Sequence, residues 1–344
     1  MPFKNIIVFI TASAVMLFFI FCPSLAVSSA YNHLNIWFNS IVPSVFPFII
    51  CISLMESIGI PSPQGKFTNF LCRSLFDLPA DVIMPVFISL LSGFPMGTRI
   101  AASLYKTGRI NSDELQRLLC FINTPSPVFT ICVVGTGLLM TPVYGRLILF
   151  SCLASAFFTA VVFRFYYTNT PSKTLKTHAS SLRTDAISSS VSAILKIGAY
   201  VIFFGIINDM LIYLPKAGHI FTLFTEMTSA SSAISSLSVP MRIKVSILAF
   251  MLSFGGICMQ VQIFSHLKEI SFNKTVYTVS LILKAVSSSL IAYLFYPFFE
   301  YGNLSYVSGS YAHSFLYSGG IPLFYITIPS ALVISYLCIK KRQV

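Results

Sequence analysis

The chain has 344 residues, of which 56% are hydrophobic and 9% are charged, and its formal net charge is +12. A soluble globular domain carries about 25% charged residues, so this chain has too few charges to cover its apolar core with a water-facing surface. The composition excludes a soluble protein and predicts an all-α polytopic membrane protein in contact with the lipid bilayer. The basic residues lie in short segments between apolar runs, which excludes a nucleic-acid-binding face and makes them signals of membrane topology.

The residues of metal sites and common active sites are not grouped in this chain. The eight cysteines include no CxxC pair and lie mostly inside apolar runs, where cysteine acts as a small hydrophobic residue. The five histidines form no HxxxH or Ser-His-Asp pattern on a shared face. The sequence therefore predicts neither an enzyme nor a metal or cofactor site.

Apolar runs long enough for a membrane-spanning helix of about 20 residues occur eight times. They cover residues 5–27, 34–60, 118–140, 143–167, 189–214, 243–267, 275–298 and 321–339. Two further apolar stretches, 82–104 and 221–239, contain helix-breaking or small polar residues and are candidates for re-entrant hairpins. Backbone that leaves its helix at membrane depth is tolerated only where protein or a wet cavity surrounds it.

The first run has two interpretations. Lys4, the apolar stretch 6–21 and the small residues at 24–26 or 28–30 fit either a retained membrane helix or a secretory signal peptide. The retained helix is favoured, and both interpretations place the amino terminus in the cytoplasm.

The distribution of basic residues favours hairpins at both broken stretches. With two hairpins, 15 of the 22 lysines and arginines lie on the cytoplasmic side, four lie outside and three lie within apolar runs. Both termini are then cytoplasmic. If every apolar stretch crossed the membrane, the basic loops at 106–117 and 173–183 would lie outside, which the positive-inside rule disfavours.

This topology divides the chain into two similar halves. Residues 1–33 are the N-terminal membrane helix or signal peptide, 34–167 the first repeat, 168–188 a cytoplasmic linker, 189–298 the second repeat, and 299–344 an extracytoplasmic loop and last helix. Each repeat reads as helix, hairpin, helix, helix, in opposite orientations. Inverted repeats with broken helices are typical of secondary transporters, whose substrate site lies where the broken elements meet.

Helix breaks in the two halves define the predicted site. Glycine and proline at these points interrupt the helix and allow close backbone approach, while amide and hydroxyl side chains serve a ligand or simply bridge helices. The predicted hairpin or helix-break residues are Ser92, Gly93, Pro95, Gly97, Pro125, Pro127, Gly255 and Gly256. The predicted substrate-binding residues are Arg99, Asn123, Thr124, Ser126, Glu226, Thr228, Ser229, Gln260, Gln262 and Lys284.

Buried charges indicate the kind of substrate. Lys284 lies near the centre of a predicted span, where a lysine costs about 2.5–3.5 kcal/mol and calls for a partner or ligand. Arg99 either joins it or extends to the cytoplasmic interface. Two cations and helix amino termini favour a small anionic substrate. Glu226 has three alternatives: it pairs with Lys284, couples a cation, or binds a polar ring through hydrogen bonds.

Several segments resemble a known family. They are LNIWFNSIVPSVFPF at 34–48, LSGFPMGTRIAASLYKTGRI at 91–110, FINTPSPVF at 121–129, EMTSA at 226–230 and, more loosely, SFGGICMQVQ at 253–262. These resemble the sporulation integral membrane proteins of spore-forming Firmicutes, the YlbJ-like group with nucleoside-recognition gate domains. The gate domain is in turn similar to concentrative nucleoside transporters.

The resemblance implies a mother-cell protein of the outer forespore membrane that transports dipicolinate, a small aromatic dicarboxylate. Nucleoside transporters use acidic and amide side chains for the sugar and the coupling cation, and here only Glu226 is of that kind. A nucleoside or related small-molecule permease and a non-transporting scaffold for spore-envelope assembly remain the alternatives. The oligomeric state, including a homo-oligomer, stays open.

Overall fold

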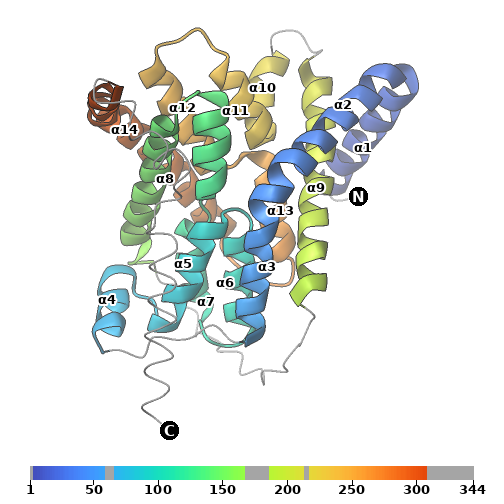
Figure 1. Ribbon diagram of the computed structural model, residues 1–344. Coiled ribbons are helices and arrows are strands. Elements are labelled where there is room, and N and C mark those ends of the chain that lie inside the picture. Colours follow the sequence, from blue (N-terminus) through green and yellow to red (C-terminus); the bar gives the residue numbers. More distant parts are fainter. Residues whose placement is uncertain (1–2, 59–65, 167–185, 213–216, 308–344) are drawn as a thin grey trace. The chain divides into compact units, whose positions relative to one another are not determined.

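The computed structural model describes residues 3–58, 66–166, 186–212 and 217–307. Every described element is helical (Figure 1). The last predicted span, 321–339, and residues 168–185 of the predicted linker lie outside the described residues. Residues Met1–Tyr296 form one compact unit and Pro297–Val344 a second; the contacts described below lie within the first.

The first part of the chain contains a sharp bend and then a long helical run. Helix α1 (Phe3–Phe21) ends before Cys22, and α2 (Pro23–Ile36) continues through a π-helical segment η1 (Trp37–Ile41) into α3 (Val42–Ile58). The two parts meet at 116°, because Pro23 lacks the amide and the space needed to continue α1. The bend therefore lies at residue 22, inside the run 5–27 that the sequence predicts as one helix.

Short helices follow in the first half of the unit. They are α4 (Lys66–Phe76), the 3₁₀ turn η2 (Ala80–Val82), α5 (Ile83–Ser92), α6 (Met96–Lys106), α7 (Ser112–Phe121) and the π-helical η3 (Phe129–Leu138). Helix α7 begins with a capping box, in which the Asn111 side chain accepts from the Glu114 amide and the Glu114 carboxylate accepts from the Asn111 amide. Helix α5 packs against α6, so the two form a helical hairpin.

The remaining helices are α8 (Pro142–Phe163), α9 (Ala186–Ile212), α10 (Ala217–Thr225), α11 (Met227–Ser235), α12 (Met241–Phe254), α13 (Gly256–His266) and α14 (Lys274–Val307). Within the described residues, four helical stretches are long and apolar enough to span a membrane, or five if the bent pair α1–α2 is one span. The four are 142–163, 186–212, 241–266 and 274–300. The protein is therefore an all-α polytopic membrane protein, as the sequence predicts.

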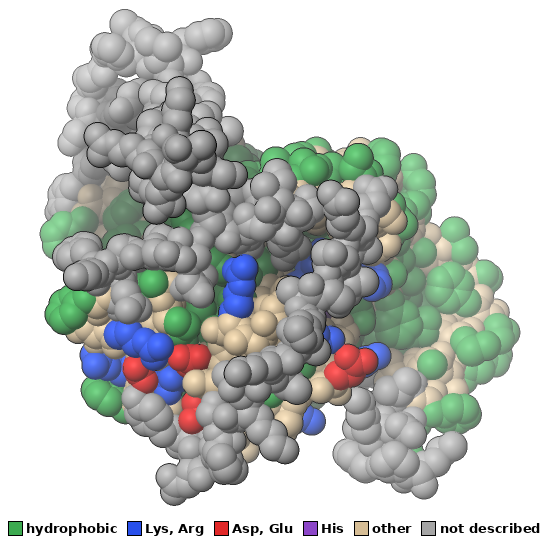
Figure 2. Space-filling model, turned by 90° about the horizontal axis from the view of Figure 1, so that it is seen from below, with side chains coloured by type: hydrophobic (Ala, Val, Ile, Leu, Met, Phe, Trp, Pro, Cys, Tyr) green, Lys and Arg blue, Asp and Glu red, His purple; other side chains and the backbone are tan. Residues whose placement is uncertain are grey.

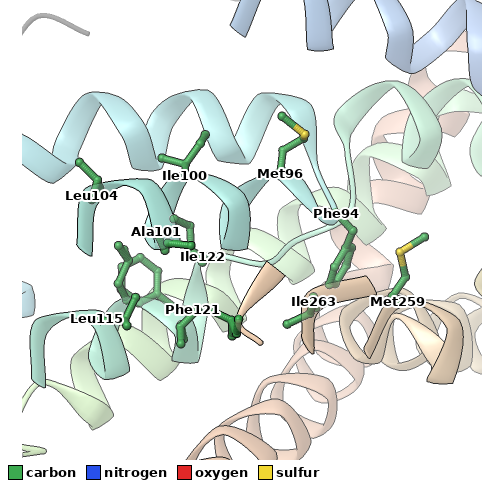
Figure 3. Close-up of a cluster of buried hydrophobic side chains, with 14 of the residues drawn as sticks. Phe94, Met96, Ile100, Ala101, Leu104, Leu115, Phe121, Ile122, Met259 and Ile263 are labelled. Carbon is green, nitrogen blue, oxygen red and sulfur yellow. The ribbon is translucent and has the colours of Figure 1, made fainter. Parts of the chain in front are cut away.

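Segments far apart in sequence lie side by side. Helix α9 packs along α2 and α3 (Figure 1), and α12 packs against α8. The main hydrophobic core is centred on α6 and α7, with contributions from α3, α5, α8, α9, α13 and α14. Figure 3 shows part of it, with Ile100 on α6, Leu115 and Phe121 on α7, and Met259 and Ile263 on α13.

Charged residues gather at one end of the helices. Figure 2, which views the molecule from below Figure 1, shows Lys and Arg side chains beside acidic ones at this end. Its ion pairs include Lys106–Glu269 at 3.0 Å, Arg73–Glu114 at 3.3 Å and Arg117–Asp77 at 3.4 Å. At the α11–α12 end, Arg242 stacks on Tyr293 and Lys244 donates to the Ser235 carbonyl. Lys106, Arg73 and Arg117, predicted to be cytoplasmic, thus lie at a different end of the helices from Arg242 and Lys244, predicted to be outside. The orientation of the chain in the membrane stays a prediction.

Candidate functional site

Four helix breaks lie in segments that the sequence singles out. Helix α5 ends before Gly93, whose φ of +75° is readily adopted only by glycine. Residues 123–126 separate α7 from the helical turn that leads into η3. Glu226 separates α10 from α11, and Gly255, with a φ of +81°, separates α12 from α13.

The two breaks of the first half press against each other. A Cβ atom on Gly93 would lie 2.5 Å from the Ser126 amide nitrogen. A Cβ on Gly97 would lie 2.8 Å from the Ile122 carbonyl oxygen and 3.1 Å from the Asn123 Oδ1. Both glycines are needed because real Cβ atoms do not approach other atoms this closely.

The two breaks of the second half meet in a similar way. A Cβ on Gly256 would lie 3.2 Å from the Thr225 carbonyl oxygen and 3.4 Å from the Glu226 amide nitrogen. In each half, therefore, the turn of a helical hairpin lies against the break in a later helix of the same half.

Phe94 joins the two halves. This residue follows Gly93 in the first hairpin turn, is 6% exposed, and lies 3.1 Å from the position of a Cβ on Gly255. Figure 3 shows its ring pointing to α13, beside Met259 and Ile263. The four breaks consequently form one region, built from both halves.

A pocket lies in this region. Its volume is about 30 Å³, which leaves room for about two water molecules. Among the predicted residues, Ser92, Ser126, Glu226 and Thr228 line it. Its apolar wall consists of Ile41, Val45, Phe94, Phe129, Ile197, Val201, Met227 and Met259, none of which the sequence singled out as a ligand contact.

Lys284 lies beside the pocket rather than in its wall. It is 2% exposed on α14, its Nζ donates to the Asn123 carbonyl oxygen, and Nζ is 5.6 Å from the centroid of the Phe94 ring. The Asn123 carbonyl follows the carboxyl end of α7, where the helix dipole carries partial negative charge. The ring of Phe94, itself part of the pocket wall, offers a second favourable contact to the ammonium.

Three buried polar atoms near the breaks have no hydrogen-bond partner among the described residues. They are Asn123 Nδ2, Thr124 Oγ1 and Thr228 Oγ1. The opposite end of the Asn123 amide is satisfied, because its Oδ1 accepts from Thr98 Oγ1 at 2.9 Å. An unsatisfied buried polar group costs about 1–3 kcal/mol, so these atoms indicate a place for water or a ligand.

Glu226 is buried, with 1% exposed, and caps its own helix. Its Oε1 accepts from the Thr228 amide at 2.9 Å and its Oε2 from the Ser229 amide at 2.8 Å. The amino terminus of α11 therefore already holds a carboxylate. Among the residues that the structure describes, no ion pair joins Glu226 to Lys284, so the first of the three predicted roles of Glu226 is wrong in this conformation.

Three other predicted binding residues lie away from the pocket wall. Gln260 bridges the Phe254 carbonyl oxygen, freed by the break at Gly255, and the Tyr277 hydroxyl, at 2.8 and 2.7 Å. Gln262 donates to Cys258 Sγ at 3.4 Å within the same helix. Arg99 is half-buried on α6, near His266. In this conformation Gln260 therefore bridges helical segments, whereas the bond of Gln262 lies within α13.

A polar cluster outside the pocket was not predicted. Asp209 Oδ2 on α9 accepts from Ser29 Oγ at 2.6 Å and lies 3.2 Å from His33 Nε2, both on α2. The available signal was an aspartate inside the long apolar run 189–214.

Together, the long apolar helices and the four breaks around a polar pocket define a polytopic α-helical membrane protein of the broken-helix type. The chain is similar to sporulation integral membrane protein YlbJ of Bacillus subtilis (strain 168). The two are 23% identical over 317 residues, which are 79% of this chain and 78% of the relative. This confirms, as distant homology, the resemblance seen in the sequence motifs. No protein-family model matches the chain, and no solved structure matches it.

Proposed function

We propose that this protein transports a small organic anion across a membrane of the sporulating cell, with dipicolinate as the predicted cargo and the outer forespore membrane as the predicted location. One observation carries the proposal: a buried lysine lies where four helix breaks meet, together with three buried polar atoms that have no hydrogen-bond partner among the described residues. These atoms are Asn123 Nδ2, Thr124 Oγ1 and Thr228 Oγ1. The name of the distant relative supports the link to sporulation.

The geometry of the breaks supports a transporter with inverted repeats. Gly93 meets Ser126 within residues 34–167, and Thr225 meets Gly256 within residues 189–298. These contacts join equivalent elements of the two predicted repeats, a hairpin turn and a later helix break. Secondary transporters with inverted repeats bind their substrates between such elements.

The chemistry around the pocket supports an anion with an apolar ring. Asn123 Nδ2 and the two threonine hydroxyls can all donate hydrogen bonds, and a carboxylate accepts them. Phe94, Phe129 and other apolar side chains of the wall offer contact to a ring. Lys284 supplies a positive charge beside them, and its present bond to the Asn123 carbonyl can be exchanged for a bond to a ligand carboxylate.

The pocket has room for about two water molecules in this conformation, far less than an aromatic dicarboxylate needs. Binding of the cargo therefore requires the hairpin turns at Phe94 and Glu226 to move apart. We take the described state as a closed one, in which Glu226 fills the amino terminus of α11 and Phe94 covers Lys284.

A nucleoside is the second candidate substrate, and Glu226 favours it. A carboxylate buried in the pocket wall repels a dianion but accepts hydrogen bonds from sugar hydroxyls. Ser126 and Thr228 in the same wall are neutral hydrogen-bonding groups suited to a sugar.

Purified full-length protein, reconstituted in liposomes, tests these proposals directly. We expect labelled dipicolinate to enter the vesicles and to raise the melting temperature of the protein, with uridine inactive in both assays. Activity with uridine instead would support the nucleoside permease. Inactivity of both compounds, with the protein folded, would favour the non-transporting scaffold over either transporter.

A further inference from the structure

The polar cluster of Ser29, His33 and Asp209 holds α2 against α9. One oxygen, Asp209 Oδ2, receives both contacts, from Ser29 Oγ at 2.6 Å and from His33 Nε2 at 3.2 Å. His33 is nearly buried, with its side chain 7% exposed, while that of Asp209 is 33% exposed. A histidine beside a carboxylate can hold one proton more or less at physiological pH.

The contact surface between α2 and α9, called the seam below, leaves room for the His33 ring. A Cβ atom on Gly205 of α9 would lie 2.2 Å from the His33 ring, and one on Gly198 would lie 2.5 Å from the Trp37 ring. The Trp37 Nε1 also donates to the Ile194 carbonyl at 3.3 Å. Gly205 and Gly198, which have no side chain, thus make room for the rings of His33 and Trp37. The two rings lie one helical turn apart on α2 and η1.

The cluster lies at a depth that protons from one side of the membrane can reach. Helix α9 has 27 residues, about 40 Å, whereas the hydrocarbon core is about 30 Å thick. Asp209 lies three residues before the end of α9, and it is therefore close to the membrane surface at that end. Ionisable side chains in membrane helices are costly and usually have a functional role.

Both helices of the seam lead directly to the pocket. Val201 of α9 and Ile41 of η1 line the pocket. Each lies eight residues from its member of the cluster, Asp209 or His33, which is about 12 Å along the helix. A change in the contact between His33 and Asp209 therefore acts on two of the pocket's walls.

Three other titratable residues belong to helices that pack on α9: Lys4 in α1, Glu56 in α3 and His219 in α10. Apart from these, the described side chains of α1, α3 and α10 include no Asp, Glu, Lys, Arg or His. On α2 the neighbouring Tyr31 is exposed, and on α9 Lys196 lies 13 residues from Asp209, about 20 Å along the helix. His266 of α13 is near Lys196 and so belongs to the far end of α9.

We propose that Ser29, His33 and Asp209 form a proton-binding site, and that binding and release of a proton there drive the opening of the pocket through α2 and α9. The proton would be held between the His33 imidazole and the Asp209 carboxylate, with Ser29 orienting the carboxylate. The site itself is independent of the cargo, while its coupling to the pocket rests on the transport function proposed above.

Trp37 provides a direct readout of the proton. It is the only tryptophan in the chain and lies four residues after His33, on the same side of the helix. A protonated imidazole quenches the fluorescence of a neighbouring indole. We expect the fluorescence of the purified full-length protein to fall as the pH is lowered from about 9 to about 5, where histidines titrate.

Variants assign this titration to the cluster. His33→Gln should make the curve flat, and Asp209→Asn should move its midpoint because the His33 ring loses the carboxylate that faces it. His266→Gln is the matched control and should leave the curve unchanged. A flat curve for the unmodified protein, or an unchanged midpoint in Asp209→Asn, overturns the proton site. Should His33→Gln fail to fold, the midpoint of Asp209→Asn decides.

Coupling is tested in liposomes with the membrane potential held at zero. If one proton moves with each dipicolinate, an inward gradient of one pH unit should support about tenfold accumulation, and Asp209→Asn should abolish this stimulation. Uptake of dipicolinate that ignores the gradient overturns the coupling. If neither dipicolinate nor uridine enters, the proposed transport function fails, whereas the proton site still depends on the fluorescence result alone.

Discussion

Gly93 lies so close to the backbone of Ser126 that a side chain on Gly93 would collide with it, the nearest approach being 2.5 Å. The contact holds the first hairpin turn against the break between α7 and η3. It also fixes the positions of Phe94, which lines the pocket, and of Asn123, whose carbonyl accepts from Lys284. The packing of two backbones therefore determines the geometry of the polar groups around the pocket.

We expect Gly93→Ala to destabilise the protein by about 2–5 kcal/mol. The positive φ costs a residue with a Cβ about 1–2 kcal/mol, and overpacking against a backbone costs about 1–3 kcal/mol more. The melting temperature in detergent measures the effect. Gly137→Ala is the matched control, because a Cβ there meets only the Cys132 carbonyl oxygen at 3.4 Å. Equal melting temperatures for the two variants would contradict the close contact.

Replacing Lys284 separates binding from folding. Lys284→Met should leave the melting temperature within a few degrees, because removal of a buried charge, worth about 2.5–3.5 kcal/mol, offsets the unsatisfied Asn123 carbonyl, worth about 1–3 kcal/mol. The same variant should lose the thermal shift with dipicolinate and its uptake. The exposed Lys196, replaced in the same way, should change neither. Full uptake by Lys284→Met would remove Lys284 from the site.

Glu226→Gln distinguishes the two candidate substrates. The amide keeps one acceptor for the α11 amino terminus, so the cost in stability should be about 1 kcal/mol. Loss of the negative charge should strengthen binding of dipicolinate severalfold. For a nucleoside permease the opposite is expected, since Glu226 then binds the sugar and the variant binds uridine more weakly. Ligand-dependent thermal shifts measure both effects in one series.

Replacing Arg117 tests how much the contacts at the charged end of the helices stabilise the fold. Its guanidinium, 4% exposed, donates to the Asp77 and Tyr166 carbonyl oxygens at 3.0 and 2.9 Å and pairs with the Asp77 carboxylate. Arg117→Ala removes all three of these contacts of a buried guanidinium together with its packing, and should cost about 3–5 kcal/mol. The side chain of Arg73, by contrast, is 51% exposed, and Arg73→Ala should cost about 1 kcal/mol or less. Chemical unfolding of the two purified variants gives the comparison.

The helix breaks could be predicted from sequence because glycine, proline and capping residues act locally. Gly93, Gly255 and Glu226 each change the backbone within one helical turn. A helix break inside an apolar run can therefore be recognised from the sequence alone. Basic loops similarly indicated which segments share an end of the molecule, as the ion pair of Lys106 with Glu269 illustrates.

The contacts between distant segments could not be predicted in this way. Lys284 was expected to face a ligand or Glu226, but it donates to a main-chain carbonyl 161 residues away, and no local pattern specifies that acceptor. The apolar residues of the pocket wall could not be predicted for a related reason. Ile41, Val201 and Met259 are ordinary apolar residues of membrane helices, and only the packing of their helices brings them together.

Gly205→Ala tests whether the seam between α2 and α9 controls the proton site. A Cβ at this position would lie 2.2 Å from the His33 ring, so the ring must move away from Asp209 although His33 itself is unchanged. We expect the midpoint of the pH-dependent fluorescence of Trp37 to shift, as in Asp209→Asn, because the imidazole loses its carboxylate partner. Gly137→Ala, away from this seam, should leave the curve unaltered. An unaltered curve for Gly205→Ala, in a protein that remains folded, would mean that His33 binds its proton without help from Asp209.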